Sequence, residues 1–290
     1  MSVHSDKNKN TSQRSSRWSQ EQRLEFIDFR LYWEGIINRS DLTTFFSISV
    51  PQASLDLARY IELAPENLEY DRKKKAYFAT PHFKPMITPS QAHGYLNPLL
   101  GVAMGTLQKA AAPFSEYPAI DVVQLPYRDV PTLTLRTILK AIRQRFSVNI
   151  EYQSLTRPDP TVRDISPHAI AFDGRRWHVR AYCHLRHRFQ DFLFARMLRI
   201  EEGAPSEIDS IQDHEWQTIL ELKITPHPNL SPSQRRVIEL DFGMSNGVAL
   251  LPVRQALVEY TLEYMGLSLL KPTSQEVILV NENELSLLLN

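Results

Sequence analysis

The sequence predicts an α+β protein of several domains, and three observations lead to this fold class. The chain has 290 residues, 42% apolar and 23% charged, which is enough for two or three hydrophobic cores. Helical periodicity dominates residues 18–65, whereas residues 148–200 alternate like β-strands. The net charge is zero, yet residues 131–200 carry 13 Lys and Arg against 5 Asp and Glu, and residues 201–290 carry 5 against 14. This gradient indicates domains with different partners, or oppositely charged surfaces that neutralise one another across an interface.

The chain begins with a polar arm and two helices. Residues 1–17 are rich in Ser, Asn and Lys, so we expect a disordered arm. Ser19 and Gln22 have the spacing of a capping box and predict a helix that ends at Gly35, a residue type that suits a helix C-terminus. Asn38 is a typical N-cap residue, and it predicts a second, short helix that runs to Phe46.

A third helix and a hairpin follow. Ser49 can cap this helix and Pro51 is tolerated in its first turn, while the predicted buried stripe is Ala53, Leu57, Ile61 and Ala64. The segments LEYD and KAYFAT then predict two short strands joined by a basic turn at residues 72–75. Three helices followed by a β-hairpin is the layout of a winged helix-turn-helix, which we assign to residues 18–92.

A winged helix-turn-helix places the second helix of its pair in the major groove, where outward polar side chains meet base edges. The candidates on this helix are Ser49, Gln52, Ser54 and Arg59, and the amide of Gln52 suits adenine. Phosphate contacts are expected from the hairpin tip, Arg72, Lys73, Lys74 and Lys75. Residues 1–85 have a net charge of only +2, so a winged helix that binds another protein stays an alternative.

Residues 93–130 predict a linker, and residues 131–204 predict a β-rich domain. The linker contains Pro and Gly around one helical run, which we interpret as a bridging helix at residues 98–112. The β-rich domain opens with an amphipathic helix, whose apolar face is Leu135, Ile138, Leu139 and Ile142. Short antiparallel strands follow, with Asp173-Gly174 as the clearest hairpin turn. We expect these strands to close into a small β-barrel.

The segment Val162–Ile200 carries eight arginines against three aspartates, although strands normally use apolar residues to fill a core. Strand alternation places His178 and Arg180 on one face and Trp177 on the other, where we expect Trp177 to lie in the core. Guanidinium groups beside stackable rings are the parts of a site for a nucleotide or a single strand. For His168 and His178, both a structural and a ligand-binding role stay open.

The C-terminal segment, residues 205–290, is acidic and predicts a small α/β domain. The pattern predicts a strand at residues 235–242, a helix at 253–267 and a strand at 275–281. This domain is expected to help fix a dimer.

Several function classes are disfavoured by the sequence. It has no Gly-rich phosphate loop, no nucleophile elbow and no His, Cys or Asp cluster with metal-ligand spacing, so we expect neither an enzyme nor a bound cofactor or metal. The single cysteine, Cys183, excludes an internal disulfide framework. No apolar run of 18 residues and no signal-peptide core are present, so we expect a cytoplasmic protein without a membrane partner.

The segments IEYQSL and RDISPHAIAFDGRRWHVRAYC, behind a winged helix and a linker helix, resemble those of WYL-domain transcriptional regulators. The chain is similar in particular to the BrxR/CapW regulators of phage-defence islands such as BREX. Of the Trp-Tyr-Leu tripeptide that names the family, only Trp177 is kept, because His178 and Val179 follow it. Arg196, Arg199 and Ile200 match the pattern that ends the family's domain.

This resemblance implies a homodimeric repressor that binds an inverted-repeat operator in double-stranded DNA, of a phage-defence operon or its own. It implies a central Sm/SH3-like β-barrel, the WYL domain, that senses a nucleotide or nucleic-acid effector. By residue match, the ligand-binding candidates are Tyr152, Ser154, His168, His178, Arg180, Arg188 and Arg196. Two alternatives stay open: an accessory protein that uses its basic barrel on single-stranded DNA or RNA, and a transcription activator.

Overall fold

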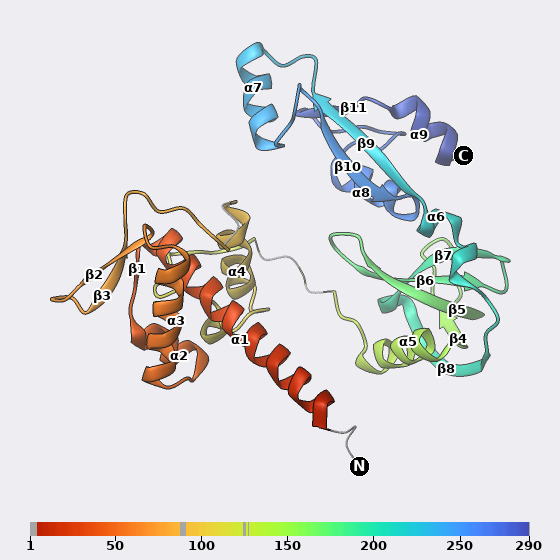
Figure 1. Cartoon of the computed structure of the whole chain (residues 1–290). Coiled ribbons are helices and arrows are strands. Elements are labelled where there is room, and N and C mark those ends of the chain that lie inside the picture. The colour runs from red at the N-terminus through yellow and green to blue at the C-terminus, as the bar shows by residue number, and fades with distance from the viewer. Residues whose placement is uncertain (1–4, 88–90, 124–125, 127, 290) are drawn as a thin grey trace. The chain divides into compact units, whose positions relative to one another are not determined.

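The computed structural model describes residues 5–87, 91–123, 126 and 128–289, with side chains between residues 19 and 288 of these ranges. The chain forms two compact units, Met1–Leu125 and Pro126–Asn290, which are described separately (Figure 1). No helix in the described part of the chain is both long and apolar enough to cross a membrane.

The first unit opens with a winged helix-turn-helix. Its elements are α1 (Ser5–Glu34), β1 (Ile36–Ile37), α2 (Arg39–Phe46), α3 (Val50–Leu63), β2 (Leu68–Asp71) and β3 (Ala76–Ala79). The strands form an antiparallel sheet in the order β1-β3-β2, so β2 and β3 make the predicted hairpin and β1 adds an edge strand that was not predicted. The predicted caps of α2 and α3 are confirmed: Asn38 forms a capping box with Asp41, and the Ser49 hydroxyl accepts a hydrogen bond from Gln52 N at 3.3 Å.

The predicted start of the first helix was wrong. α1 begins at Ser5 rather than at Ser19, so residues 5–17 continue the helix where a disordered arm was expected, and residues 1–4 lie outside the described residues. Once tertiary packing has nucleated a helix, each further residue adds one hydrogen bond at little extra cost. The Lys, Arg, Gln and Ser residues of the arm are compatible with such an extension. The end was predicted correctly, because Gly35 follows α1 with a φ of +73°.

The buried face of α3 differs from the predicted one at one position. Leu31, Leu42 and Leu57 are fully buried, as is Tyr60, whereas Ile61 is exposed. On a helix with 3.6 residues per turn, position 60 stays closer than position 61 to the line through Ala53 and Leu57. The buried stripe of α3 therefore runs through Tyr60 instead of Ile61.

The segment predicted as a linker contains α4 (His93–Ala103) and the short 3-10 helix η1 (Lys109–Ala111), and it packs against α1. Leu99 of α4 and Phe114 are buried against Phe29 of α1, and the Tyr95 and Trp33 rings lie 5.3 Å apart. The helix that we expected to bridge two domains is thus part of the first compact unit.

The second unit begins with a helix and a five-stranded antiparallel sheet. The elements are α5 (Thr132–Gln144), β4 (Phe146–Tyr152), β5 (Thr161–Phe172), β6 (Trp177–Cys183), β7 (Arg188–Leu193), η2 (Phe194–Arg196) and β8 (Met197–Pro205). The strand order is β7-β6-β5-β4-β8. The predicted barrel is not closed by hydrogen bonds, because β8 returns to pair with β4 and, among the described residues, leaves β7 and β8 as the two edges.

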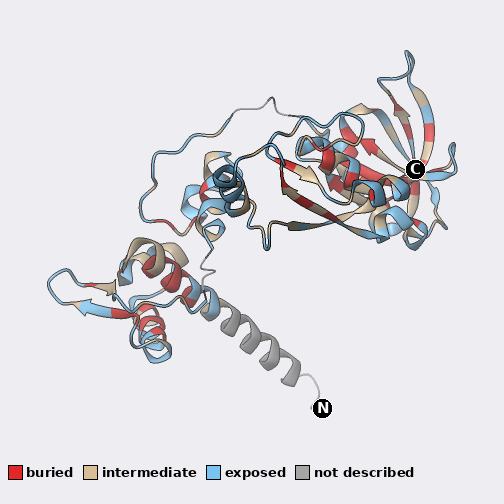
Figure 2. Ribbon diagram, turned by 90° about the horizontal axis from the view of Figure 1, so that it is seen from above, coloured by how far each residue is buried: buried red, intermediate tan, exposed pale blue. Residues whose placement is uncertain are grey.

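Buried side chains from one face of this sheet and from α5 form the core of the β-rich domain. Buried residues are coloured red in Figure 2. Val179, Ala181 and Cys183 are buried there together with Ile138 of α5, as the alternation predicted. Trp177 was expected in this core but is 47% exposed, with its ring 4.8 Å from that of Phe172. It pairs with Phe172 next to the turn of the β5–β6 hairpin, and both rings are about half exposed there.

The C-terminal part folds differently from the prediction. Its elements are η3 (Ser210–Gln212), α6 (His214–Gln217), β9 (Ile219–Pro226), α7 (Pro232–Asp241), β10 (Ala249–Arg254), η4 (Gln255–Leu257), α8 (Val258–Tyr264), β11 (Val277–Leu279) and α9 (Glu282–Leu289). Three antiparallel strands pair in the order β10-β9-β11. The strand predicted at 275–281 is confirmed as β11, but β9 and α9 were missed, and the helix predicted at 253–267 is β10 at its start and α8 at its end.

The strand predicted at residues 235–242 is the helix α7. Its start carries a complete capping box between Ser231 and Gln234, and Pro232 occupies the first turn, where proline is favoured. The short apolar run Val237, Ile238 and Leu240 resembles the pattern of a strand. The capping box before this run stabilises a helix instead.

Candidate nucleic-acid and ligand sites

The outward face of α3 carries the predicted base-reading residues. Ser49 is occupied as the N-cap of α3, and the Ser54 hydroxyl donates a hydrogen bond to the carbonyl of Val50 at 3.0 Å. Arg59 is exposed and pairs with Glu62 across one turn at 2.9 Å, a surface pair of small energetic value that a phosphate or base can replace. Leu55 is 64% exposed beside them.

Gln52 is the predicted DNA-reading side chain that the protein holds most firmly. Its Nε2 donates to both carboxylate oxygens of Asp56, at 3.2 and 3.3 Å. Asp56 is fully buried, and Arg23 of α1 donates to it from Nε at 2.6 Å and from Nη2 at 3.2 Å. An ionised carboxylate only accepts hydrogen bonds, so Nε2 faces Asp56 and Oε1 faces away. The free N–H and Oε1 form the donor–acceptor pair that matches the major-groove edge of adenine.

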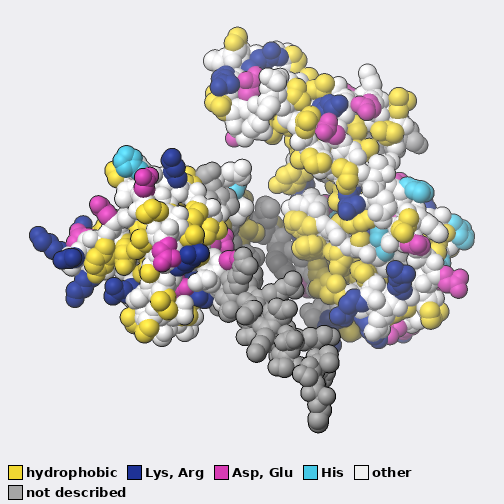
Figure 3. Space-filling model, in the orientation of Figure 1, with side chains coloured by type: hydrophobic (Ala, Val, Ile, Leu, Met, Phe, Trp, Pro, Cys, Tyr) yellow, Lys and Arg dark blue, Asp and Glu magenta, His cyan; other side chains and the backbone are white. Residues whose placement is uncertain are grey.

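The tip of the β2–β3 hairpin carries four exposed cations, Arg72, Lys73, Lys74 and Lys75 (Figure 3). Asp71 fixes the turn, because its Oδ1 accepts the backbone N–H groups of Lys73 at 2.7 Å and Lys74 at 3.1 Å. These hydrogen bonds, that of Lys74 first, lower the pKa of Asp71. Lys74 Nζ lies 4.8 Å from the centre of the Phe78 ring. The β2–β3 hairpin, which is the wing of the winged helix, therefore presents its positive charge on an ordered turn.

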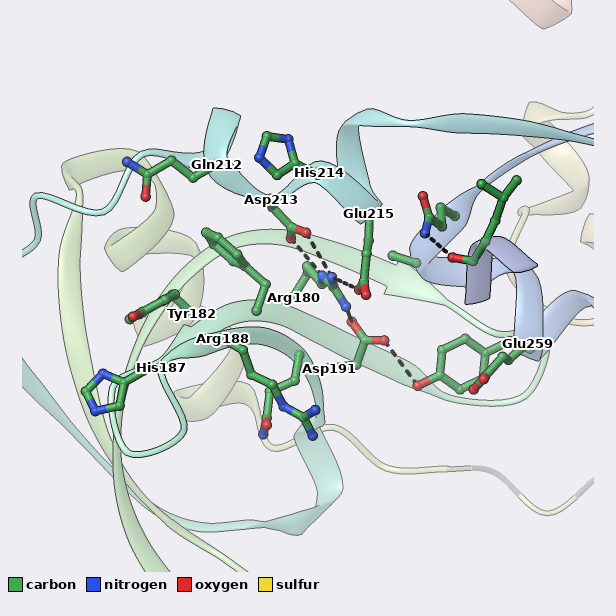
Figure 4. Close-up of a pocket in the computed structure, with 16 residues that line it drawn as sticks. Arg180, Tyr182, His187, Arg188, Asp191, Gln212, Asp213, His214, Glu215 and Glu259 are labelled. Carbon is green, nitrogen blue, oxygen red and sulfur yellow. Dashed lines mark hydrogen bonds and ion pairs between the residues drawn. The ribbon is translucent and has the colours of Figure 1, made fainter. Parts of the chain in front are cut away.

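The second unit contains a cavity of about 830 Å³ between β6 and β7 of the sheet and segments of the C-terminal part (Figure 4). Of the seven predicted ligand-binding residues, Arg180 and Arg188 line it. Its other walls come from Gln212 to Glu215, from η4 and α8, and from Leu288. No described group of His, Cys, Asp or Glu side chains is arranged to hold a metal ion.

Arg180 is buried in this cavity wall, where three carboxylates surround it (Figure 4). Its Nε and Nη2 donate to the two oxygens of Asp213, at 2.7 and 2.8 Å, and Nη2 also donates to Glu215 at 2.6 Å. Asp191 lies 3.4 Å from Nη1. Burial disfavours the charged guanidinium, but these carboxylates outweigh burial and raise the pKa of Arg180. For Asp191, burial dominates over the nearby guanidinium and raises its pKa.

The two histidines predicted for the ligand site each hold a carboxylate near the cavity. His168 Nε2 lies 2.9 Å from Asp213, and His178 Nε2 lies 2.7 Å from Asp173. Burial opposes ionisation of Asp173, but His178 and two backbone N–H groups of the hairpin turn lower its pKa to about 2. His168 thus connects β5 to Asp213 in the cavity wall, whereas the His178–Asp173 contact lies within the β5–β6 hairpin, and neither residue of that pair lines the cavity.

The structure does not bring the other three predicted ligand residues to this cavity. Tyr152 is buried in the core, where its hydroxyl accepts a hydrogen bond from Leu193 N at 3.2 Å. Ser154 lies in the turn after β4, with its hydroxyl 2.7 Å from that of Thr156. Arg196 belongs to η2, and its carbonyl accepts a hydrogen bond from Gln153 N at 3.0 Å.

Sequence reasoning missed the acidic partners Asp191, Asp213 and Glu215, as well as Tyr260, whose hydroxyl donates to Asp191 at 3.2 Å. For Asp213 and Glu215, the only signal was the charge gradient between residues 131–200 and 201–290. The structure shows that part of this gradient is neutralised inside the second unit, at Arg180. That was the alternative interpretation of the gradient.

Comparison with protein families identifies all three parts of the chain. Residues 19–101 match the winged helix-turn-helix domain of the BrxR transcriptional regulator, residues 133–202 match the WYL domain, and residues 219–285 match the C-terminal dimerization domain of the BrxR transcriptional regulator.

Curated relatives agree over nearly the whole chain. The DNA-binding transcriptional repressor CapW of Stenotrophomonas maltophilia is 42% identical, covering 92% of this chain and 91% of the relative. CapW of Escherichia coli (strain KTE188) is 40% identical over 94% and 93%, and CapW of Pseudomonas aeruginosa is 44% identical over 87% and 85%. A solved structure, Proteasome accessory factor B/C (PafBC) of Arthrobacter aurescens, aligns with 14% identity and a TM-score of 0.30, and the chain spans 46% of its length. The chain therefore belongs to the BrxR/CapW family of WYL-domain transcriptional regulators.

Proposed function

We propose that this protein is a homodimeric transcriptional repressor that binds an inverted-repeat operator of its own or a phage-defence operon. The observation that carries the proposal is the arrangement of Gln52 on α3, held by a buried ion pair, on the same unit as an ordered cationic wing. One part can read bases and the other can contact phosphates, which is the division of labour in specific DNA binding. The CapW relatives, named as DNA-binding transcriptional repressors, support it.

A homodimer is supported by the C-terminal part. Residues 219–285 match a dimerization domain, and in this segment Val237, Leu240 and Leu250 are each more than half exposed. Exposed apolar side chains of this kind are expected at an interface that a second copy covers. Two-fold symmetry then places two α3 helices on half-sites separated by about one helical turn of DNA or a multiple of it.

The WYL domain is proposed to sense a nucleotide or nucleic-acid effector. The cavity at Arg180 and Arg188 has the volume of a ligand pocket, and the rings of Tyr182 and Phe189 in its wall lie 5.2 Å apart. An effector releases the operator only if it binds one dimer geometry more tightly than the other.

DNase footprinting on the DNA upstream of the protein's own gene tests the repressor. We expect protection of an inverted repeat by the full chain, and loss of that protection, without loss of fold, after Gln52→Ala and Arg59→Ala. Weak binding of any duplex, unaffected by these substitutions, would overturn the proposal. Length-dependent binding of any single strand in place of the repeat would support the accessory nucleic-acid-binding protein, and a reporter gene separates repression from activation.

A further inference from the structure

The three carboxylates around Arg180 are not equally fixed. Asp213 is buried, accepts two hydrogen bonds from Arg180, lies 2.9 Å from His168, and also caps α6 by accepting Trp216 N at 3.3 Å. Asp191 is held by the Tyr260 hydroxyl. Glu215 has a 56% exposed side chain, and Arg180 is its only partner among the residues whose side chains are described. Glu215 is therefore the one carboxylate of the three that can leave without breaking another bond.

Glu215 also stands at the wall of the cavity of about 830 Å³, so a group that enters the cavity can reach the guanidinium position that Glu215 occupies (Figure 4). Arg188 lines the same cavity and makes no ion pair with a described residue. The walls further contain the rings of Tyr182, Phe189 and Tyr260. Cations beside aromatic rings suit a ligand with an anionic group and a planar ring, which is the chemistry of a nucleotide or of the end of a single strand.

We propose that Glu215 is an internal competitor of the effector: it occupies Arg180 in the unliganded protein, and a phosphate of the effector replaces it. This proposal rests on the effector-sensing function proposed above. The exchange is balanced in charge, because one anion leaves the guanidinium as another arrives, while the Glu215 carboxylate moves into water where it is well solvated.

The position of Glu215 in the chain gives this exchange a consequence. It belongs to α6, the single turn between the sheet and β9, the central strand of the C-terminal sheet. Glu215 and Asp213 together attach this turn to β6. Loss of one of these two attachments loosens α6 on the side of β6, while Arg254 and Gln255 still donate hydrogen bonds to the carbonyls of Trp216 and Thr218. Occupancy of the cavity is in this way transmitted to the segment that matches the dimerization domain.

Competition predicts that removal of the Glu215 charge tightens effector binding, because the apparent dissociation constant is raised by the fraction of protein in which the site is already filled. The test uses the full-length Glu215→Gln variant and, as probe, 5′-phosphorylated tetrathymidylate with a 3′ fluorophore, followed by fluorescence anisotropy. We expect binding tighter than that of the unmodified protein by about three- to tenfold. Glu259→Gln removes the same charge from the cavity wall but touches no bond of Arg180, so its gain should stay below about twofold.

A second measurement follows α6 itself. Hydrogen exchange of the amides of Trp216, Gln217 and Thr218, which are bonded within this turn, should accelerate when the probe saturates the unmodified protein and should be fast from the start in Glu215→Gln. Two results would contradict the role of Glu215 as a competitor without contradicting the effector site. One is an equal gain in probe affinity in Glu215→Gln and Glu259→Gln, and the other is unchanged hydrogen exchange of α6 on probe binding. Absence of probe binding in both the unmodified protein and Glu215→Gln would overturn the competitor and the effector-sensing function together. Footprinting tests the repressor independently.

Discussion

At the residue scale, the side chain of Gln52 reaches the surface while its orientation is decided inside the protein, by Asp56 and Arg23. A glutamine on a free helix face would sample both orientations of its amide and would lose side-chain entropy on binding DNA. Here the carboxylate fixes the amide before DNA arrives. If Gln52 reads a base as proposed, Asp56 is a positioning residue for that contact, although it is fully buried and cannot contact DNA in the fold described.

Asp56→Asn should lower the preference for the operator over unrelated DNA by about tenfold, the value of a well-formed contact to one base. A double-mutant cycle with Gln52→Ala separates this effect from general destabilisation. In the Gln52→Ala background, Asp56→Asn should have no further effect on the preference, measured by competition at fixed salt. A further loss in that background would show that Asp56 acts on the fold of the domain instead.

Asp173 provides a prediction for acid conditions. Its pKa is lowered to about 2, so its contribution to the free energy of unfolding is complete above the ordinary carboxyl pKa of about 4 and is lost as the pH falls towards 2. Between about pH 4 and 2, the free energy of unfolding of the second unit should fall less in Asp173→Asn than in the unmodified protein, by on the order of 1 to 2 kcal/mol. Urea unfolding at several pH values measures this difference. An identical pH dependence in both proteins would contradict the proposed linkage.

The role of Arg180 shows what could not be predicted for single residues. The alternation of side chains along β6 correctly placed Arg180 on the face opposite to Val179 and Ala181. It also favoured an exposed arginine that is free to bind a ligand. Its main partner, Asp213, lies 33 residues further along the chain in an irregular segment, and no periodicity connects the two positions. By contrast, the positions of Gln52 on a helix and of the four cations on a hairpin turn were predictable, because helix and hairpin geometry are local.

At the element scale, the wing formed by β2 and β3 should act through charge alone. Reversal of charge at Arg72, Lys73, Lys74 and Lys75 should weaken binding to all DNA sequences alike and reduce the salt slope of log K by up to about 4. Titrations at several salt concentrations measure this slope. Lys271→Glu, an exposed cation outside the winged helix, is the control and should leave the slope unchanged. A change in sequence preference upon wing reversal would assign base contacts to the wing.

The packing of α4 on α1 gives a stability prediction. Leu99 is 5% exposed in the cluster with Phe29 and Phe114, so Leu99→Ala should lower the free energy of unfolding of the first unit by about 2 to 4 kcal/mol. Leu96 lies on the same helix and is 50% exposed, and Leu96→Ala should change this free energy by less than about 0.5 kcal/mol. Urea unfolding followed by circular dichroism measures both. Equal effects of the two substitutions would show that α4 is not anchored by Leu99.

Helices and strands were predictable where the sequence pattern that specifies them lies within the element or next to it. The helices α2, α3 and α5 and the β2–β3 hairpin follow from caps, periodicity and turn residues. In the C-terminal part, α7 was misread because its apolar residues stand close together, and β9 was missed although its Leu222 and Ile224 are buried. The open sheet was not predicted, because it results from pairing between β4 and β8, which are distant in the sequence.

At the scale of the whole molecule, the proposed two-fold dimer would set the distance between the two α3 helices on DNA. Insertion of about 5 base pairs between the operator half-sites should abolish binding of the dimer to both half-sites, since it turns one half-site to the opposite side of the duplex. Insertion of about 10 base pairs should restore part of the affinity in a gel-shift titration. Equal affinity for all three spacings would show that the half-sites are bound independently.

The ion pairs of Arg180 also bear on the order of events during synthesis. The buried guanidinium of β6 leaves the ribosome 33 residues before Asp213, which at 5–20 residues per second is an interval of about 2 to 7 s. During this time the sheet contains Asp191 but still lacks Asp213 and Glu215, the two carboxylates closest to Arg180. The winged helix is already complete. The nascent chain therefore completes its winged helix while the second unit is still incompletely folded, and chaperone contact should be concentrated on residues 126–213 in that interval.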